Sequence, residues 1–414
     1  MLQIITGKFF TSNDLHTTHH TVVFYTNYRM FREKFSTKVG TIKPASKWHD
    51  IYTLIYEFDE KLEIASSSSD TTGEIKPIGL VSVGYQDIAN DFSSIASFVL
   101  RITMTTDSEL AERLIHSDRP SPNVNQPASS YIDRYFEKEV IIDINDEILL
   151  NKLIDKLIAL PRNKYEGVMK SIRRFITGTR RVSDDLELAY TLLVASIENL
   201  AQKFDGFSPE WENLDHNKKR DMDEAMRGID IQSISKIRTS LLKYEHLALS
   251  RRFKEFAKFY IKPDFFRDQA IGIDFAIKES DLDLSLKNAY ALRSRYIHTL
   301  EDLPRYLTLI SQKAESVDIF DGPTLTINGL ARLARTIIIN YVMSQESIEV
   351  EEFDYRSSLP GTVTMKLSAE YWIWQPEGFD SKTASNRLSG LIDNLLNCFV
   401  SRDGKLADRE KYAA

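Results

Sequence analysis

The chain has 414 residues, of which 42% are hydrophobic and 11% aromatic, enough to build more than one packed core. Its formal net charge is −7 at pH 7, so the molecule as a whole is not basic and any contact with nucleic acid must be local. A single cysteine, Cys398, excludes an internal disulfide framework and a cysteine-rich zinc site, and it fits a reducing compartment. No apolar run approaches the length of a membrane span and the start lacks a signal-peptide pattern, so we expect a cytoplasmic protein without membrane contact.

The first 145 residues have the composition of a β-rich domain. Short segments rich in β-branched and aromatic residues alternate with turn residues, which predicts strands at 21–26, 47–58, 61–67, 75–84, 97–105 and 138–146. One helix is predicted, at 108–117. His16, His19 and His20 lie among Thr and Asn residues before the first strand, a pattern more typical of an exposed loop than of a metal site.

From about residue 146 to residue 345 the apolar residues recur with helical spacing. We expect helices at 146–160, at 165–178, from about 183, and at 217–227, 231–247, 250–260, 283–299 and 328–343. Gly178 is expected to stop the second helix, and Asp184 and Asp185 to lie in the first turn of the third. Helices joined by short polar links predict an all-α bundle.

Residues 346–414 predict a β-hairpin followed by an amphipathic helix that packs on the bundle. The expected fold class is therefore α+β, with domains at 1–145, 146–345 and 346–414.

The helix expected at 283–299 carries Arg293 and His298, separated by four residues. A guanidinium can hold a phosphate and an imidazole can transfer a proton near neutral pH, a pair that indicates metal-free phosphodiester chemistry. On an ideal helix the two residues lie roughly 140° apart, so both reach one phosphate only if the helix ends or bends between them or a second copy completes the site. The alternative is that Arg293 pairs with a helix carboxylate such as Glu301 and that His298 merely ends the helix.

Glu198 lies in an apolar run, TLLVASIENLAQ, where helical spacing turns it toward neighbouring helices. A buried carboxylate there needs a partner, and Arg293 is the obvious candidate. The alternative places Glu198 on a solvated edge with Asn199 and Lys203.

Basic residues gather in two stretches of the helical region, the second with Phe and Tyr interleaved. Such patches can guide RNA into a cleft, with the aromatic rings stacking on bases, although a solvated helix face is the alternative for either stretch. The RNA-binding candidates are Arg173, Arg174, Arg180, Arg181, Arg251 and Arg252.

Three segments in this order, 184–204, 291–304 and 325–342, resemble the helices of HEPN domains. These all-helical modules carry an Arg-x(4–6)-His motif and often act as metal-independent RNases in prokaryotic toxin-antitoxin and abortive-infection systems. Leu292, Arg293, Ile297 and His298 fall at motif positions and Glu198 at the acidic position of the early helix. Ser294 stands where active members often have Asn, Asp or His. The resemblance covers roughly residues 150–345.

The resemblance implies that Arg293 clamps the scissile phosphate while His298 acts as general acid or base and the 2′-OH of the RNA attacks. It also implies a homodimer in which two motifs face each other, with Arg295, Tyr296 and Glu198 as supporting residues and with neither a metal nor a cofactor. The N-terminal domain would then recognise an unknown trigger and restrain a toxic nuclease in antiviral defence. The alternative function, favoured by Ser294, is a HEPN-like interaction or scaffold module without catalysis.

Overall fold

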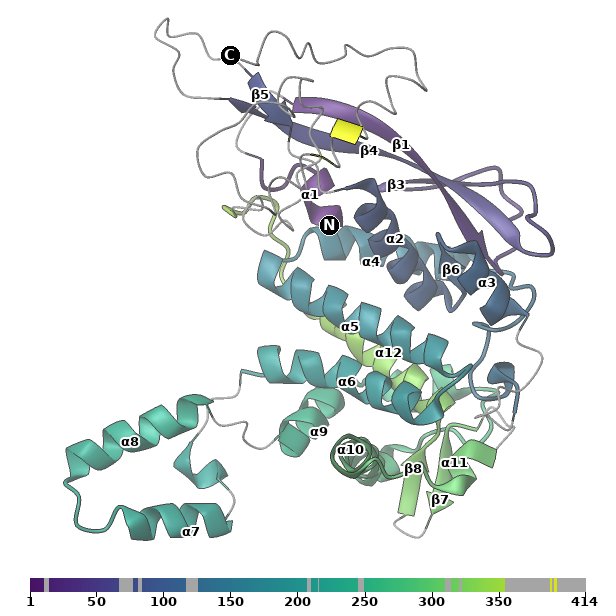
Figure 1. Cartoon of the computed structure of the whole chain (residues 1–414). Coiled ribbons are helices and arrows are strands. Elements are labelled where there is room, and N and C mark those ends of the chain that lie inside the picture. The colour runs from purple at the N-terminus through teal and green to yellow at the C-terminus, as the bar shows by residue number, and fades with distance from the viewer. Residues whose placement is uncertain are drawn as a thin grey trace, which may run out of the picture. The chain divides into compact units, whose positions relative to one another are not determined.

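The computed structural model of the chain describes residues 1–10, 15–66, 77–80, 84–116, 126–206, 210–214, 216–244, 249–309, 314–319, 322–353, 388 and 391–392 (Figure 1). Internal contacts divide the chain into two compact units. The first holds Met1–Phe10, Thr17–Lys61 and Tyr85–Tyr355, and the second holds Thr11–His16, Leu62–Gly84 and Arg356–Ala414. A sheet together with many helices confirms the α+β class. The boundary predicted at residue 145 lies within the first unit, and the C-terminal hairpin and helix predicted at 346–414 fall almost wholly outside the described residues.

The sheet is built from strands in the first part of the chain. Its order is β2-β3-β4-β1-β6, with β5 paired to β4, and its strands are β1 (Leu15–Thr26), β2 (Phe35–Thr37), β3 (Gly40–Pro44), β4 (Tyr52–Ser66), β5 (Pro77–Leu80) and β6 (Met104–Thr105). β3 pairs antiparallel with β2 and with β4, so Ile42 lies opposite Phe35 on one side and Tyr56 on the other. The strands predicted at 21–26, 47–58, 61–67 and 75–84 overlap β1, β4 and β5 and are confirmed in type.

The histidine-containing segment is part of β1, so its prediction as an exposed loop is wrong. His19 Nδ1 lies 2.9 Å from Asp59 Oδ1, and His20 Nε2 lies 2.9 Å from Glu60 Oε2 on β4. These pairs across neighbouring strands give the polar residues partners, which the composition of the segment alone does not reveal.

The residues predicted as a strand at 97–105 instead begin as the end of helix α2 (Tyr85–Leu100). Ile88, Phe92, Ile95 and Val99 recur every three or four residues, and this helical period prevails over the β-branched composition of the segment. From residue 88 to residue 100 only Asn90 is exposed. Helix α2 packs on the sheet, where Phe92 stacks on Tyr56 with ring centroids 4.2 Å apart, and on the bundle, where Phe98 meets Phe175 edge to face at 5.0 Å.

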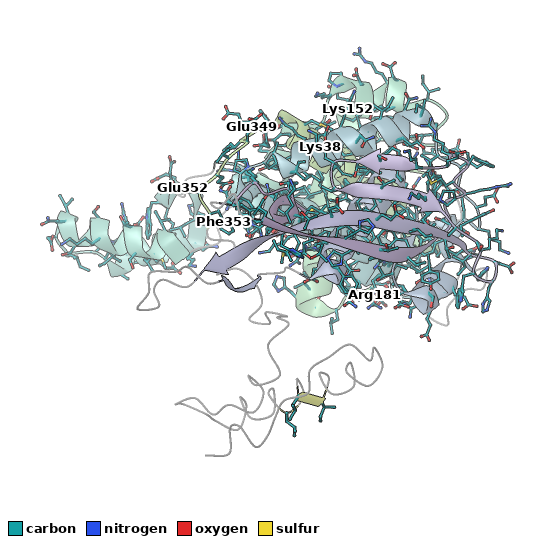
Figure 2. All side chains as sticks on the ribbon, turned by 90° about the horizontal axis from the view of Figure 1, so that it is seen from above. Lys38, Lys152, Arg181, Glu349, Glu352 and Phe353 are labelled. Atoms are coloured by element: carbon teal, nitrogen blue, oxygen red, sulfur yellow. The ribbon has the colours of Figure 1, made fainter. Side chains whose placement is uncertain are left out.

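The strand predicted at 138–146 is reduced to one parallel bridge between Tyr28 and Val140. The side chain of Asp143 accepts hydrogen bonds from the backbone N–H groups of Asn145 (2.7 Å) and Asp146 (2.9 Å), which starts helix α4 (Ile144–Ile158) instead. In the first unit α4 also meets the sheet, because Lys38 in the turn after β2 forms an ion pair with Asp155 (Nζ to Oδ1, 3.5 Å; Lys38 is labelled in Figure 2).

The predicted succession of helices is confirmed, with boundaries shifted by a few residues. The remaining α-helices are α1 (Leu2–Ile5), α3 (Ser108–Ile115), α5 (Arg162–Arg181), α6 (Leu186–Phe204), α7 (His216–Ala225), α8 (Ile231–Tyr244), α9 (Leu249–Tyr260), α10 (Leu282–Thr299), α11 (Arg305–Leu309) and α12 (Ile327–Ser344). Short 3-10 helices occupy Ala128–Ser130, Trp211–Asn213, Pro263–Phe266, Asp268–Ala270 and Glu279–Asp281. β7 (Ser316–Ile319) and β8 (Gly322–Leu325) form an antiparallel hairpin. Asp185 is the N-cap of α6 rather than a first-turn residue, since its side chain accepts from Leu188 N–H at 2.8 Å.

Gly178 does not end its helix, contrary to the prediction, because α5 continues to Arg181. A Cβ at this position would lie 3.2 Å from the carbonyl oxygen of Ala189 and 3.2 Å from Leu192 Cβ, both on α6. Gly178 therefore serves the close approach of α5 to α6, and both helices lie beside α12 in the core of the bundle (Figure 1).

Candidate functional site

Helix α10 carries the predicted motif. Leu286, Ala289 and Leu292 are buried and hold the helix on the bundle. Leu300 adopts a left-handed conformation (φ 54°) and donates its N–H to Tyr296 O at 3.0 Å, which ends the helix directly after the turn that contains His298. The fold therefore places Arg293 beside the buried ridge of α10 and His298 at its exposed end.

Arg293 forms an ion pair with Glu198 of α6, with Nη2 2.7 Å from Oε2. Glu198 is only 4% exposed, and its Oε1 also accepts from Gln202 Nε2 at 3.0 Å and from the Tyr290 hydroxyl at 3.3 Å. The predicted partnership of Glu198 with Arg293 is confirmed, and the alternative that places Glu198 on a solvated edge is wrong. The apolar neighbours of Glu198 in α6 were a valid sequence signal, because a buried carboxylate requires hydrogen-bond donors.

The Arg293 guanidinium is held on two sides. Its Cζ lies 5.7 Å from the centre of the Tyr290 ring, and its Nε is buried without a hydrogen-bond partner in the described part of the chain. Burial raises the pKa of Tyr290 to about 12, with the charge of Glu198 adding to the shift, so this hydroxyl remains a hydrogen-bond donor at neutral pH.

His298 has a different environment. It is exposed, and no hydrogen bond or ion pair joins it to another described residue. Exposed apolar side chains flank it, since Ile297 is 45% exposed and Leu300 is 75% exposed. The imidazole is thus available to a ligand or to another chain. Neither it nor Arg293 lines the two large cavities described below.

Acidic residues act on the two other supporting residues of the motif helix, Arg295 and Tyr296. Arg295, not Arg293, pairs with Glu301 (Nη1 to Oε1, 3.3 Å), which corrects the alternative partner proposed for Arg293. Tyr296 is half-buried, and burial followed by the charges of Asp185 and Glu187 raises its pKa.

The basic residues predicted on α5 do not share one environment. Arg173 pairs with the buried Asp91 through Nε (3.1 Å) and Nη2, and Arg181, labelled in Figure 2, pairs with Asp184 at 2.9 Å. Arg180 is half-buried with its Nη2 3.4 Å from Met104 O, and burial lowers its pKa. Arg174 is exposed and has no carboxylate partner among the described residues. Most of this basic stretch is therefore engaged within the protein.

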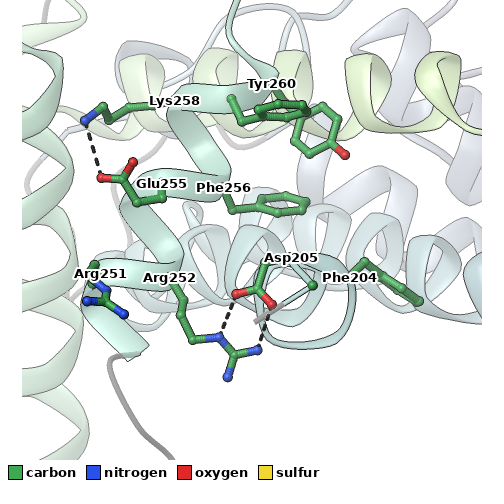
Figure 3. A pocket seen from close by; sticks show the side chains of 10 residues that line it. Phe204, Asp205, Arg251, Arg252, Glu255, Phe256, Lys258 and Tyr260 are labelled. Atoms are coloured by element: carbon green, nitrogen blue, oxygen red, sulfur yellow. Dashed lines mark hydrogen bonds and ion pairs between the residues drawn. The ribbon is translucent and has the colours of Figure 1, made fainter. Parts of the chain in front are cut away.

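The basic and aromatic residues predicted on α9 do come together, around a cavity of about 800 Å³ (Figure 3). Arg252 holds Asp205 in a two-point ion pair, with Nε 2.6 Å from Oδ2 and Nη2 3.0 Å from Oδ1. Aromatic rings that can stack on a base lie beside cations that can face phosphates. The lining residues are Phe204, Asp205, Gly206, Arg251, Arg252, Glu255, Phe256, Lys258, Phe259 and Tyr260.

Helix α9 also contacts the motif helix. The Phe253 ring lies 5.5 Å from the Tyr290 ring, and Lys254 Nζ lies 2.8 Å from Asp283 Oδ2. The aromatic cavity, the Glu198 to Arg293 ion pair and the motif helix thus belong to neighbouring helices of one bundle.

No group of three or more His, Cys, Asp or Glu side chains within the described ranges could hold a metal ion. None of the helices in that part of the chain has an apolar stretch long enough to cross a bilayer. No protein-family model, curated protein or solved structure matches the chain. The resemblance to HEPN domains therefore rests on the three sequence segments alone and remains a prediction.

Proposed function

We propose that the chain is a metal-independent endoribonuclease of HEPN type, with Arg293 on the scissile phosphate and His298 transferring the proton. The observation that supports it best is the contrast between the two side chains. The guanidinium of Arg293 is anchored by the buried Glu198, whereas the imidazole of His298 is exposed one turn further along α10 and engages no described residue. This chemistry requires a positive charge held in place for the phosphate and a base that is available to the substrate.

In the proposed reaction an imidazole removes the proton of the RNA 2′-hydroxyl while that oxygen attacks phosphorus. The bond from phosphorus to the 5′-oxygen breaks, and a protonated imidazole donates to the leaving oxygen. The products are a 2′,3′-cyclic phosphate and a 5′-hydroxyl. The Arg293 guanidinium offsets the charge that develops on the phosphate oxygens.

A second copy of the chain would complete the site, because the two residues lie roughly 140° apart around an ideal helix. The apolar side chains of Ile297 and Leu300 on either side of His298 suit such a contact. The rings and cations of the cavity on α9 would hold a stretch of RNA next to the motif helix. In this proposal the N-terminal sheet recognises a trigger and keeps a toxic nuclease silent, as expected for antiviral defence.

The test uses purified protein with transfer RNA or total RNA in the presence of EDTA. We expect cleavage that leaves 2′,3′-cyclic phosphate ends and that is lost in His298→Ala. Because His298 is exposed, this substitution should change the free energy of unfolding by less than about 0.5 kcal/mol. His216→Ala, which changes another exposed histidine at a helix end, is the matched control and should cleave normally. Cleavage that requires a divalent metal, or that persists in His298→Ala, would contradict the proposal.

The alternative is a HEPN-like interaction or scaffold module without catalysis. One observation favours it: the charge of Arg293 is already neutralised by a buried carboxylate, as in an ion pair whose role is structural. In that case the wild type and His298→Ala would grow alike when expressed in bacteria and neither would cut RNA. Substitution of Arg293 would then alter stability alone.

A further inference from the structure

A second cavity, of about 510 Å³, lies within the first unit and was not predicted. Seven parts of the chain line it: the residue after α2, the segment 132–135, helix α4, helix α5, the segment 269–274, Glu315 and helix α12. Its volume is in the range of small-molecule sites, and apolar side chains of Ile132, Leu149, Phe175 and Ile339 form part of its wall.

Two arginines, Arg101 and Arg335, line this cavity, and neither has a carboxylate partner among the described residues. Arg335 of α12 donates from Nε to Phe98 O (3.1 Å) and from Nη2 to Val99 O (2.6 Å), at the end of α2. Burial, followed by the charge of Arg101, lowers the pKa of the Arg335 guanidinium to about 10. Arg101 has a buried Nε that bonds to no described residue. An anion between them would relieve both the repulsion and the unmade hydrogen bond.

A third donor in the cavity is also unused. Tyr135 is 4% exposed, and its hydroxyl is buried with no hydrogen-bond partner among the residues described. Burial raises its pKa, while the charges of Arg335, Arg101 and Arg134 oppose the shift, so the hydroxyl keeps its proton at neutral pH. A buried hydroxyl without a partner is costly, and its presence beside an arginine pair points to a ligand.

The backbone around these groups is firmly held. The side chain of Asn27 is fully buried and donates from Nδ2 to Arg134 O (2.8 Å), Tyr135 O (3.4 Å) and Glu137 O (2.8 Å), while its Oδ1 accepts from Thr103 N–H (3.0 Å). Arg101 (φ 57°) and Arg134 (φ 69°) both adopt the left-handed conformation, which is unfavourable for a residue with a Cβ and is found at binding sites. The site is thus preorganised rather than formed by mobile side chains.

Acidic residues of the cavity do not cancel this charge. Glu315 is engaged by Arg332 through Nε and through Nη2 (2.6 Å), and it also accepts from Ile277 N–H at 3.1 Å. Asp274 is exposed. Asp133 has an interaction of its own, and its Oδ1 is buried without a hydrogen bond to a described residue, so one carboxylate shares the cavity with the two guanidinium groups. Contact with the carbonyls at the end of α2 accounts for the position of Arg335. This contact does not explain why Arg101 Nε and the Tyr135 hydroxyl are buried without hydrogen bonds to described residues.

We infer that this cavity binds a phosphate-bearing small molecule of about mononucleotide size. The phosphate lies between Arg101 and Arg335 with the Tyr135 hydroxyl donating to it, and the organic part contacts the apolar wall. The inference is independent of the ribonuclease proposal, because it concerns binding at residues that the cleavage reaction does not use.

The test measures the thermal unfolding of the full chain with inorganic phosphate, pyrophosphate, adenosine 5′-monophosphate and, as a neutral counterpart, adenosine. We expect the phosphate-bearing probes to raise the unfolding temperature and adenosine to leave it unchanged. Arg101→Gln should abolish the shift, whereas Arg305→Gln, which removes an exposed arginine of α11, should respond as the wild type does.

Tyr135→Phe keeps the test decisive if Arg101→Gln does not fold, because it removes only a hydroxyl that makes no hydrogen bond. The unliganded variant should be at least as stable as the wild type, and its affinity for the phosphate probes should fall about tenfold. Two results would overturn the inference: no shift with any phosphate-bearing probe at about 10 mM, or equal shifts in the wild type, Arg101→Gln and Tyr135→Phe.

Discussion

Replacing Arg293 by Met tests the energetic role of the motif arginine separately from any catalysis. Among the described residues, the substitution leaves the Glu198 carboxylate, 4% exposed, with the hydrogen bonds from Gln202 and Tyr290. Breaking a fully buried ion pair costs about 3–5 kcal/mol. The Arg293 side chain is 18% exposed, so water can reach part of the vacated space, and we expect a loss of about 2–3 kcal/mol in the free energy of unfolding.

The double-mutant cycle with Glu198→Gln isolates the interaction. Glu198→Gln should cost about 1 kcal/mol because Arg293 can turn toward water, and the double variant should lose about 2 kcal/mol less than the sum of the two single losses. Urea denaturation followed by tryptophan fluorescence and by far-UV circular dichroism gives the four free energies. The exposed pair of Arg295 on α10 and Glu301 just beyond its end is the matched control, with a coupling below about 0.5 kcal/mol expected from the same cycle. Equal couplings for the two pairs would refute the reasoning that burial makes the Arg293 pair strong.

Two further predictions concern stability. Gly178→Ala brings a Cβ to 3.2 Å from the carbonyl oxygen of Ala189, and we expect a net loss of about 1 kcal/mol, since overpacking outweighs the gain in helix propensity. Gly329→Ala, where the Cβ would lie 2.0 Å from Glu315 O, should be clearly worse by the same denaturation assay, and a reversed order would contradict the packing argument. The pKa of Tyr290 is raised to about 12 in the folded protein, so its phenol ionises at lower pH in the unfolded chain than in the folded one. The stability that the neutral phenol contributes is therefore fully present below pH 10 and is lost as the pH rises to 12. Compared with Tyr290→Phe, the wild type should lose about 1 kcal/mol of unfolding free energy over that pH range, a value reduced because the ring is half-exposed. If the free energies of the two proteins change in parallel with pH, the raised pKa of Tyr290 is rejected.

Much of the bundle could be predicted from the sequence, because the period of apolar residues reports directly which side of a helix is buried. Helices α4 to α10 and α12 follow from this period, as does the partnership of Glu198 with Arg293. Asp185 was misjudged because a capping side chain and a first-turn side chain look alike in a sequence. Asp143 was assigned to the strand predicted at 138–146 because the β-branched residues before it suit a strand. Gly178 was misjudged because the reason for its presence lies on α6.

Helix α2 shows why composition fails at a buried element. Its second half contains Phe98 and Val99 and is followed by Ile102 and Thr103, a composition that suits a strand. Because α2 is buried on both sides, apolar residues occur all around it, and composition alone does not distinguish a buried helix from a buried strand. The cavity around Arg101, Tyr135 and Arg335 had no local signal at all. Its donors come from separate segments, joined by Asn27, and no spacing rule connects them.

Helix α2 packs on both the sheet and the helical bundle, which limits how the chain can be cut into separately folding fragments. A fragment that starts at residue 146 would lack the helix against which Phe175 packs and would present that face of α5 to water. A fragment that ends at residue 145 would keep α2 but leave Phe98 without its cover. We therefore expect that neither fragment folds stably by itself and that limited proteolysis near residue 145 releases no stable fragment. Helix α2 thus links Tyr56 of the sheet to Phe175 of the bundle through its own Phe92 and Phe98.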